Sequence, residues 1–154
     1  MKTIVVRRVI PQPIDRVFDV LGDHEGYSAF PGVTLAKLLK QGRDVRNGQG
    51  AVRRIELGRV WFEEEITLFE PPRRMDYRIL RSRPAIEHRA GSIRLEETGS
   101  GTLVTWTSTF RIKLPLGSPL VTPFVAKVGE KAFAGMLKAV EKKLRITGPP
   151  EDAR

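Results

Sequence analysis

The sequence predicts an α+β protein in which a curved antiparallel sheet of about six or seven strands wraps around a long C-terminal helix. Three observations favour this fold. Residues 102–112 alternate between apolar and polar side chains, which is the period of a half-buried strand. Residues 48–57 and 60–69 flank a two-residue Gly58-Arg59 loop, which is typical of a β-hairpin. Residues 125–144 carry apolar side chains at helical spacing, so this segment needs an apolar surface to pack against.

The N-terminal part is expected to hold one strand and two short helices. Residues 3–10 are rich in β-branched side chains and stop at Pro11, which predicts a strand. Residues 14–21 place apolar side chains at helical spacing, and this short helix ends at Gly22. Residues 24–30 form either a second short helix or a turn.

The other strands follow in order along the chain. They are predicted at residues 33–39, 48–57, 60–69, 73–80, 87–96 and 102–112. Gly91 interrupts the fifth of these strands and marks the position of a bulge. In the last strand, one face carries Val104, Trp106, Phe110 and Ile112.

The final helix begins near residue 118. Ser118 is expected to cap it, with Pro119 in the first turn, and Pro123 is expected to split off or kink that turn. Its apolar side combines Val125, Val128, Ala132, Phe133, Met136, Leu137, Val140 and Leu144. Gly129 and Gly135 lie near that side and either leave room for a ligand or allow close packing on the sheet.

The hairpin register predicts a buried ion pair. With a two-residue loop, Arg53 lies opposite Glu64 on a face that is otherwise apolar, so both side chains should point inward. One interpretation is an ion pair that neutralises itself near the edge of a cavity. The other is a polar anchor for a ligand, or an acid/base group. If the anchor hypothesis holds, Glu64→Gln is expected to keep the fold and weaken ligand binding.

A set of inward-facing side chains is the predicted ligand-binding surface, and for each of them an ordinary core role is the alternative. It comprises Arg53, Ile55, Phe62, Glu64, Met75, Tyr77, Ile79, Trp106, Phe110, Phe133 and Met136. Catalytic residues are not identified by any motif, and Glu64 and Arg53 are the only candidates. His88 is interpreted as a surface or hydrogen-bonded residue, with a catalytic base as the alternative, and His24 is expected to be exposed to solvent. No metal site or cofactor is predicted, because two separated histidines lack a carboxylate constellation.

The composition narrows the class of protein. The 154 residues fit one domain over residues 1–147, with a disordered tail at 148–154. The sequence has no cysteine, which excludes disulfides, thiolate zinc sites and thiol catalysis. We expect a cytoplasmic protein, since neither a signal peptide nor a stretch of ~20 apolar residues is present. The net charge of +9 is scattered and lacks a nucleic-acid-binding motif, so no specific nucleic-acid partner is expected.

The order of elements resembles the helix-grip superfamily, also called SRPBCC or START-like. Its members include START domains, birch-pollen-allergen-like proteins and bacterial polyketide cyclase/dehydrase-like proteins. The resemblance covers about residues 3–145 and rests on residues 11–21, 65–78 and 101–107. These are structural motifs, so they predict the fold more strongly than any chemistry.

The resemblance implies a cavity between sheet and helix that holds a lipid, a polyketide, a quinone or a similar small hydrophobic molecule. The scarcity of titratable residues on the predicted inner faces favours a binder that is non-enzymatic or only weakly enzymatic. The alternative is a cyclase or dehydratase, a lyase-type enzyme, acting on a polyketide-like substrate through Glu64, Arg53 and Tyr77. A third hypothesis is an adaptor whose basic face binds an anionic surface or a protein. The sequence leaves a monomer and a dimer equally open.

Overall fold

A computed structural model describes residues 1–147, so the tail predicted at 148–154 lies outside the described residues. The elements are β1 (Lys2–Ile10), α1 (Ile14–Gly22), the 3-10 helix η1 (Glu25–Ala29), β2 (Leu35–Lys40), β3 (Val52–Leu57), β4 (Val60–Glu70), β5 (Arg74–Arg83), β6 (Ile86–Thr98), β7 (Gly101–Ile112) and α2 (Ser118–Thr147). The seven strands form one antiparallel sheet in the order β1-β7-β6-β5-β4-β3-β2. The predicted architecture is confirmed.

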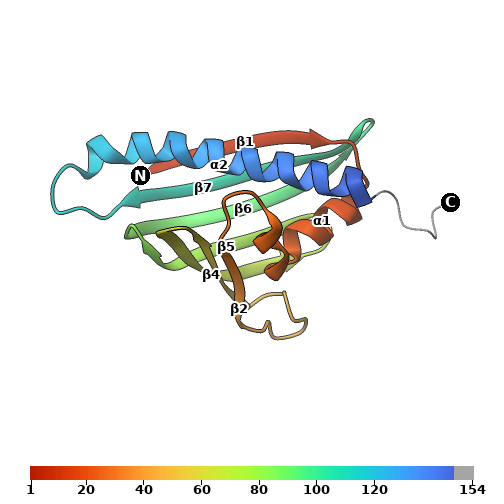
Figure 1. Ribbon diagram of the computed structural model, residues 1–154, viewed down its shortest axis with the longest axis horizontal. Coiled ribbons are helices and arrows are strands. Elements are labelled where there is room, and N and C mark those ends of the chain that lie inside the picture. The colour runs from red at the N-terminus through yellow and green to blue at the C-terminus, as the bar shows by residue number, and fades with distance from the viewer. Residues whose placement is uncertain (148–154) are drawn as a thin grey trace.

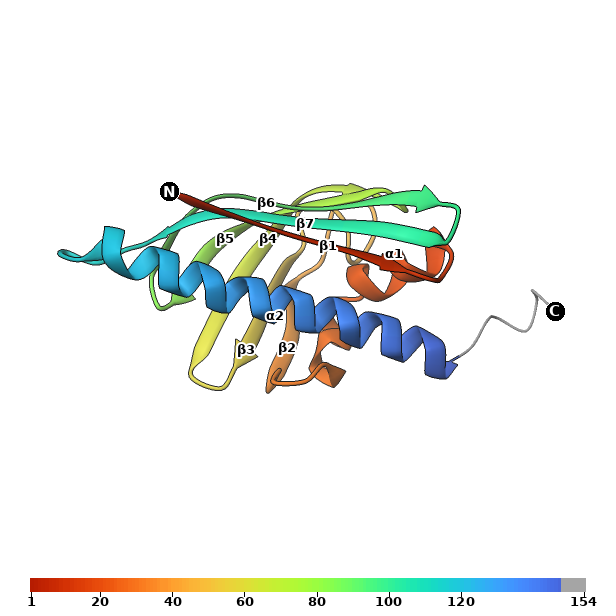
Figure 2. The same cartoon turned by 90° about the horizontal axis from the view of Figure 1, so that it is seen from above.

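The sheet curves around the long helix. Figure 1 shows α2 running along β1 and β7, with α1 at one end and the remaining strands curling away below it. The view from above in Figure 2 shows α2 crossing in front of the sheet, with β2 and β3 on the far side from β1. This arrangement gives the sheet one concave face, and α2 covers that face mainly along the β1–β7 edge.

The β3–β4 hairpin has the predicted register. Gly58 takes the first loop position with φ 66°, a left-handed conformation that glycine adopts without steric cost. Arg53 then pairs with Glu64, and Arg54 pairs with Glu63 on the opposite face. On that outer face the guanidinium of Arg54 lies 4.1 Å from the ring centroid of Trp61.

The bulge in β6 is at a different residue from the one predicted. The register between β6 and β7 shifts between His88 and Ala90, so Arg89 is the extra residue. Gly91 instead pairs with Tyr77 of β5 in regular register. A Cβ atom on Gly91 would lie 2.3 Å from the Tyr77 ring, so glycine is required there because the ring passes over the backbone.

Helix α2 differs from the prediction at its start. The Ser118 hydroxyl donates to the carbonyl of Ile112 instead of capping the helix, and the first helical bonds run to the Gly117 carbonyl. The helix continues through Pro123, so its first turn is not split off. Pro123 is close to the N-terminus, where the missing proline N–H removes few helical bonds.

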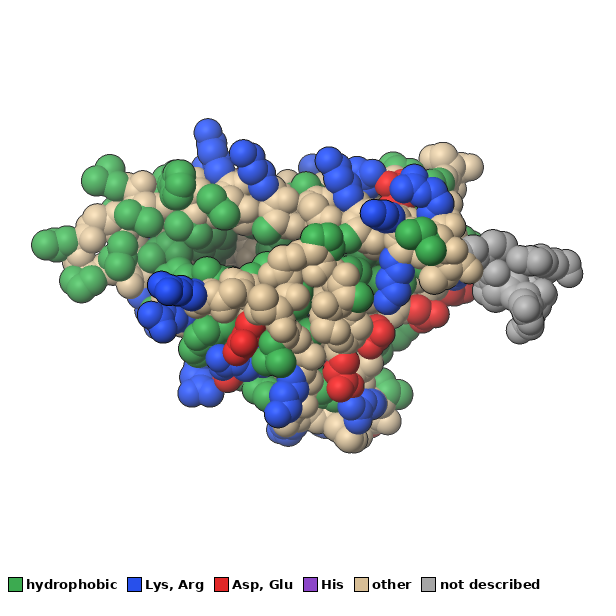
Figure 3. All heavy atoms as spheres, viewed as in Figure 1, with side chains coloured by type: hydrophobic (Ala, Val, Ile, Leu, Met, Phe, Trp, Pro, Cys, Tyr) green, Lys and Arg blue, Asp and Glu red, His purple; other side chains and the backbone are tan. Residues whose placement is uncertain are grey.

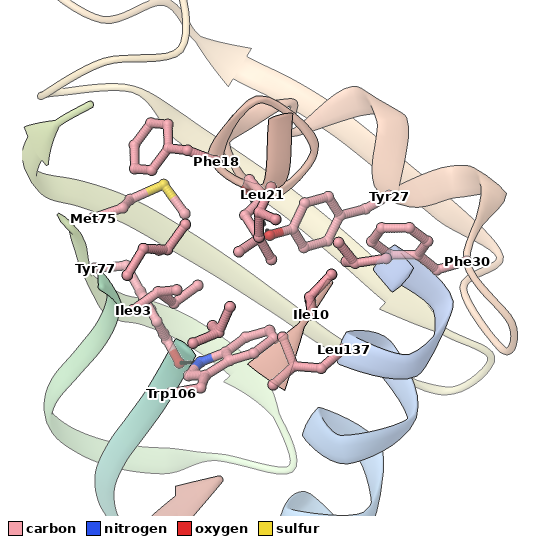
Figure 4. Packing of buried hydrophobic residues seen from close by; sticks show 14 of the residues in the cluster. Ile10, Phe18, Leu21, Tyr27, Phe30, Met75, Tyr77, Ile93, Trp106 and Leu137 are labelled. Atoms are coloured by element: carbon pink, nitrogen blue, oxygen red, sulfur yellow. Dashed lines mark hydrogen bonds between the residues drawn. The ribbon is translucent and has the colours of Figure 1, made fainter. Parts of the chain in front are cut away.

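The core lies between the concave face of the sheet, α1 and α2. Helix α1 contributes Val17 and Leu21, and α2 contributes Leu137, Val140 and Leu144. The Trp106 ring of β7 stacks on Phe133 of α2 with ring centroids 4.2 Å apart. Each such large side chain contributes about 1.5–3 kcal/mol when fully buried, which ties the helix to the sheet. Figure 4 shows Leu21 of α1, Trp106 of β7 and Leu137 of α2 pointing into this core. Val128 and Ala132, predicted on the buried side of α2, are exposed.

Candidate functional site

A buried ion pair lies in the interior, formed by Arg53 of β3 and Glu64 of β4. The Nε atom of Arg53 donates to Oε2 of Glu64 over 2.8 Å. Arg53 is 1% exposed, and the side chain of Glu64 is 10% exposed. The inward orientation predicted from the hairpin register is therefore correct. Within residues 1–147, no side chain donates to the second carboxylate oxygen of Glu64, Oε1.

Residues from the N-terminal segment enclose the Arg53 guanidinium. Its carbon lies 4.8 Å from the Tyr27 ring centroid and 5.7 Å from that of Tyr77. Its Nη1 atom lies 3.1 Å from Nδ1 of His24. The prediction that His24 is exposed is wrong, since the residue is fully buried. Its other ring nitrogen, Nε2, donates to the backbone carbonyl of Asn47 over 2.8 Å, so the loop before β3 covers it.

The charges and protonation states of this cluster are consistent with one another. Burial, together with the positive charge of Arg53, lowers the pKa of His24 to about 3. The neutral imidazole then carries its proton on Nε2 and accepts the Arg53 N–H at Nδ1. Burial is the largest single influence and by itself lowers the pKa of Arg53, but Glu64 and Tyr27 together outweigh it and the net shift is upward. Arg53 thus stays charged although it is buried.

A second polar cluster lies on the neighbouring strands β5, β6 and β7. The indole Nε1 of Trp106 donates to the Tyr77 hydroxyl over 2.9 Å, as Figure 4 shows. The His88 ring stacks on Tyr77 with centroids 5.6 Å apart. The backbone N–H of Ile79 donates to Nδ1 of His88, so Nε2 carries the proton and donates to Ser108. Burial lowers the pKa of His88 to about 4 and keeps it neutral.

The remaining predicted ligand-binding residues fall into two groups. Ile55, Met75, Tyr77, Trp106 and Phe110 are buried in the core. Phe62, Ile79, Phe133 and Met136 face inward but stay half-buried, which is expected of side chains that border open space. Figure 3 shows a recess lined largely by hydrophobic side chains beneath the first half of α2. The structure therefore brings the predicted residues to one concave face. The first group is buried within the core, and only the half-buried group borders open space.

Sequence reasoning missed four polar residues of this interior: His24, Tyr27, His88 and Ser108. Strand alternation places His88 on the outer face, and only the bulge at Arg89 turns it inward. Ser108 does alternate with Trp106 and Phe110, so its inward position was available from the pattern. His24 and Tyr27 lie in and beside a short 3-10 helix, where residue spacing does not define a buried side.

Residues 1–147 contain no cluster of three or more His, Cys, Asp or Glu side chains arranged to bind a metal ion. In the same residues, no helix is both long and apolar enough to cross a membrane.

Solved structures share this fold over nearly their whole length. A START superfamily protein from Mycobacterium smegmatis is 14% identical, with a TM-score of 0.78 and 95% of this chain and 99% of that chain covered. A protein from Thermus thermophilus is 21% identical, with a TM-score of 0.79 and coverage of 96% and 100%. The Zhui aromatase/cyclase from a Streptomyces species is 21% identical, with a TM-score of 0.73 and coverage of 92% of both chains. At these identities the likeness shows the fold alone.

The concave sheet closed by α2 defines a START-like helix-grip protein of the SRPBCC superfamily. The chain belongs to the family described as polyketide cyclase / dehydrase and lipid transport, whose family model matches residues 1–145. A sequence search among curated proteins finds no match.

Proposed function

We propose that this protein binds a small, mainly apolar molecule between the sheet and α2, and that Glu64 accepts a hydrogen bond from it. The supporting observation is the Arg53–Glu64 pair within an apolar concave face. Arg53 uses Nε on one carboxylate oxygen, while the other oxygen accepts no bond from the side chains of residues 1–147. A partly desolvated carboxylate that keeps a free lone pair favours a ligand hydroxyl or N–H.

The half-buried inner side chains supply the apolar part of the proposed site. Phe62 and Ile79 lie on the sheet near Glu64, and Phe133 and Met136 are half-buried side chains of α2. Such a site matches the usual composition of ligand pockets, in which apolar walls surround a few polar groups. The family description, which includes lipid transport, is consistent with cargo of this kind.

Catalysis is the second candidate function, and His88 is the residue that bears on it. His88 is half-buried on the inner wall and neutral, as a general base requires. Both of its ring nitrogens are already bonded, one to the Ile79 N–H and one to Ser108. A proton transfer at His88 requires one of these bonds to break, which favours binding over cyclase or dehydratase chemistry.

Two measurements test the proposed function. Native mass spectrometry of freshly purified protein should reveal a co-purifying apolar molecule. Titration with 1-naphthol and with naphthalene then separates the anchor from the apolar walls, because only 1-naphthol offers a hydroxyl donor. Glu64→Gln is expected to weaken 1-naphthol binding by roughly tenfold and to leave naphthalene binding unchanged.

Glu65→Gln is the matched control, because Glu65 lies on the opposite face of the same strand beside Arg78. Equal losses for both probes in Glu64→Gln would contradict the anchor role. Wild-type protein that binds neither probe and carries no molecule would contradict the proposed function as a whole.

A further inference from the structure

Large apolar side chains are exposed at the end of the molecule where α2 begins. Leu116 is 90% exposed, Leu120 84%, Phe124 70% and Val128 54%. We call these four residues the apolar tip. Figure 3 shows hydrophobic side chains gathered at this end, over the start of α2 and the loop before it. Single exposed apolar residues are common on proteins, but a contiguous group of this size marks an interaction surface.

The apolar tip lies on the outward side of a helix that is already packed on its inward side. Residues 120, 124 and 128 are spaced by four and therefore share one face of α2. On the opposite side of the same turns, Thr122 and Ala126 are buried. Packing against the sheet thus does not explain the apolar residues of the outward face.

Lysines adjoin the apolar tip on the same outward face. Lys127 and Lys131 are exposed within and just beyond it, and Lys113 is exposed in the preceding loop. Glu130 is the acidic residue of these turns, and the whole chain carries a net charge of +9. The surface therefore combines apolar side chains with positive charge. Two copies of it would repel each other, whereas an anionic surface with an apolar interior complements it.

We propose that the apolar tip inserts into the interfacial layer of an anionic lipid bilayer, with the three lysines contacting lipid headgroups. A helix with an apolar outer face bordered by lysines is suited to lie in that layer, and exposed leucine and phenylalanine supply the buried area. Lysines near an anionic leaflet add electrostatic attraction. This inference goes beyond ligand binding, because the protein without cargo carries the whole surface.

A groove lies beside the apolar tip. It has a volume of about 650 Å³ and lies between the start of β6, the end of β7 and the start of α2, and its lining combines apolar with charged side chains: Ile112, Leu114 and Pro119 with Glu87, Arg111 and Lys113. Insertion of the apolar tip would bring this groove to the bilayer surface.

Vesicle co-sedimentation of the full chain tests the proposal. The probes are vesicles of phosphatidylcholine with about 30% phosphatidylserine, and vesicles of phosphatidylcholine alone. We expect binding to the anionic vesicles that weakens at high salt, and little binding to the neutral ones. The double variant Leu120→Ser/Phe124→Ser should bind at least roughly tenfold more weakly.

The chain offers matched controls for both parts of the surface. Ile146→Ser changes a residue that is 73% exposed at the other end of α2 and should leave vesicle binding unchanged. Lys127→Gln/Lys131→Gln should weaken binding to anionic vesicles, whereas Lys37→Gln/Lys40→Gln on β2 should not.

Three results would overturn the proposal. They are wild-type protein that does not bind anionic vesicles, a Leu120→Ser/Phe124→Ser variant that binds them like Ile146→Ser, and a dimer seen by analytical ultracentrifugation that the same variant abolishes without any vesicle binding. The last result would assign the apolar tip to a second copy of the chain.

Discussion

The Nε atom of Arg53 lies 2.8 Å from Oε2 of Glu64 across the β3–β4 hairpin, and the guanidinium is almost completely buried. Burying one unpaired charge costs several kcal/mol, so each partner makes the burial of the other tolerable. The pair also joins the sheet to the N-terminal segment, because the same guanidinium contacts His24 and Tyr27.

Removal of one partner should destabilise the protein strongly. Arg53→Met leaves Glu64 without its counter-charge and is expected to lower the free energy of unfolding by about 3–5 kcal/mol. Arg46→Ala is the control, because Arg46 and Glu25 form a pair that is about half exposed (54% and 51%) and should contribute at most about 1 kcal/mol. Urea denaturation of both variants measures the difference. Equal losses of unfolding free energy in the two variants would show that the burial of Arg53 does not increase its contribution to stability.

Glu64→Gln should lose stability as well as ligand affinity, because it removes the counter-charge of a buried guanidinium. The amide carbonyl of the introduced glutamine can still accept the Arg53 N–H, so the loss should be smaller than that of Arg53→Met. We expect about 1–3 kcal/mol in urea denaturation. A loss as large as that of Arg53→Met would show that the hydrogen bond contributes nothing once the charge is gone.

Stability should fall as the pH falls from about 6.5 to about 4. In the folded protein the pKa of His24 is lowered to about 3 and that of His88 to about 4, against an ordinary value of 6.5. The unfolded chain therefore takes up protons in this range while the folded protein does not, and proton uptake favours unfolding. Urea denaturation at a series of pH values measures the slope. His88→Gln should flatten it, and an unchanged slope in that variant would contradict the assignment.

Gly91→Ala should destabilise the sheet where Tyr77 packs on β6. The added Cβ would lie 2.3–2.6 Å from three atoms of the Tyr77 ring, so the ring and its bond to Trp106 must shift. Overpacking of this kind costs about 1–3 kcal/mol or more. Gly99→Ala is the matched control, since a Cβ there meets nothing within 4 Å. Thermal unfolding that gives both variants the same midpoint would disprove the close contact.

Ligand binding should change the fluorescence of Trp106 and leave that of Trp61 unaffected. Trp106 is buried on the concave face against Phe133, whereas Trp61 lies on the outer face beneath Arg54. Titration of the Trp61→Phe variant with naphthalene should reproduce the wild-type change, and Trp106→Phe should abolish it. A change that persists in Trp106→Phe would place the probe outside the proposed site.

The β3–β4 hairpin shows why part of the site was predictable. A two-residue loop determines which residues face each other, and strand alternation determines which of them face the core. From these two local rules, Arg53 and Glu64 are predicted to pair inside an apolar face, as the structure shows. The apolar spacing of α2 likewise predicts Leu137, Val140 and Leu144 as buried residues.

His24 and His88 show where such rules stop. His24 is buried because a loop more than twenty residues further along the chain supplies the Asn47 carbonyl. His88 faces inward because a bulge at Arg89 reverses the alternation. Neither the burial of His24 nor the inward orientation of His88 can be read from the spacing of neighbouring residues, because both depend on segments that meet only after the sheet has formed.

The sequence by itself determined the sheet and helix architecture, the hairpin register and the buried Arg53–Glu64 pair, because each follows from spacing between near neighbours. Only the tertiary structure decided what surrounds that pair. Long-range contacts placed His24 and Tyr27 around Arg53, turned His88 toward Tyr77, and left the Leu120 and Phe124 side chains exposed on α2. These are properties of how distant segments pack, and residue spacing carries no information about them.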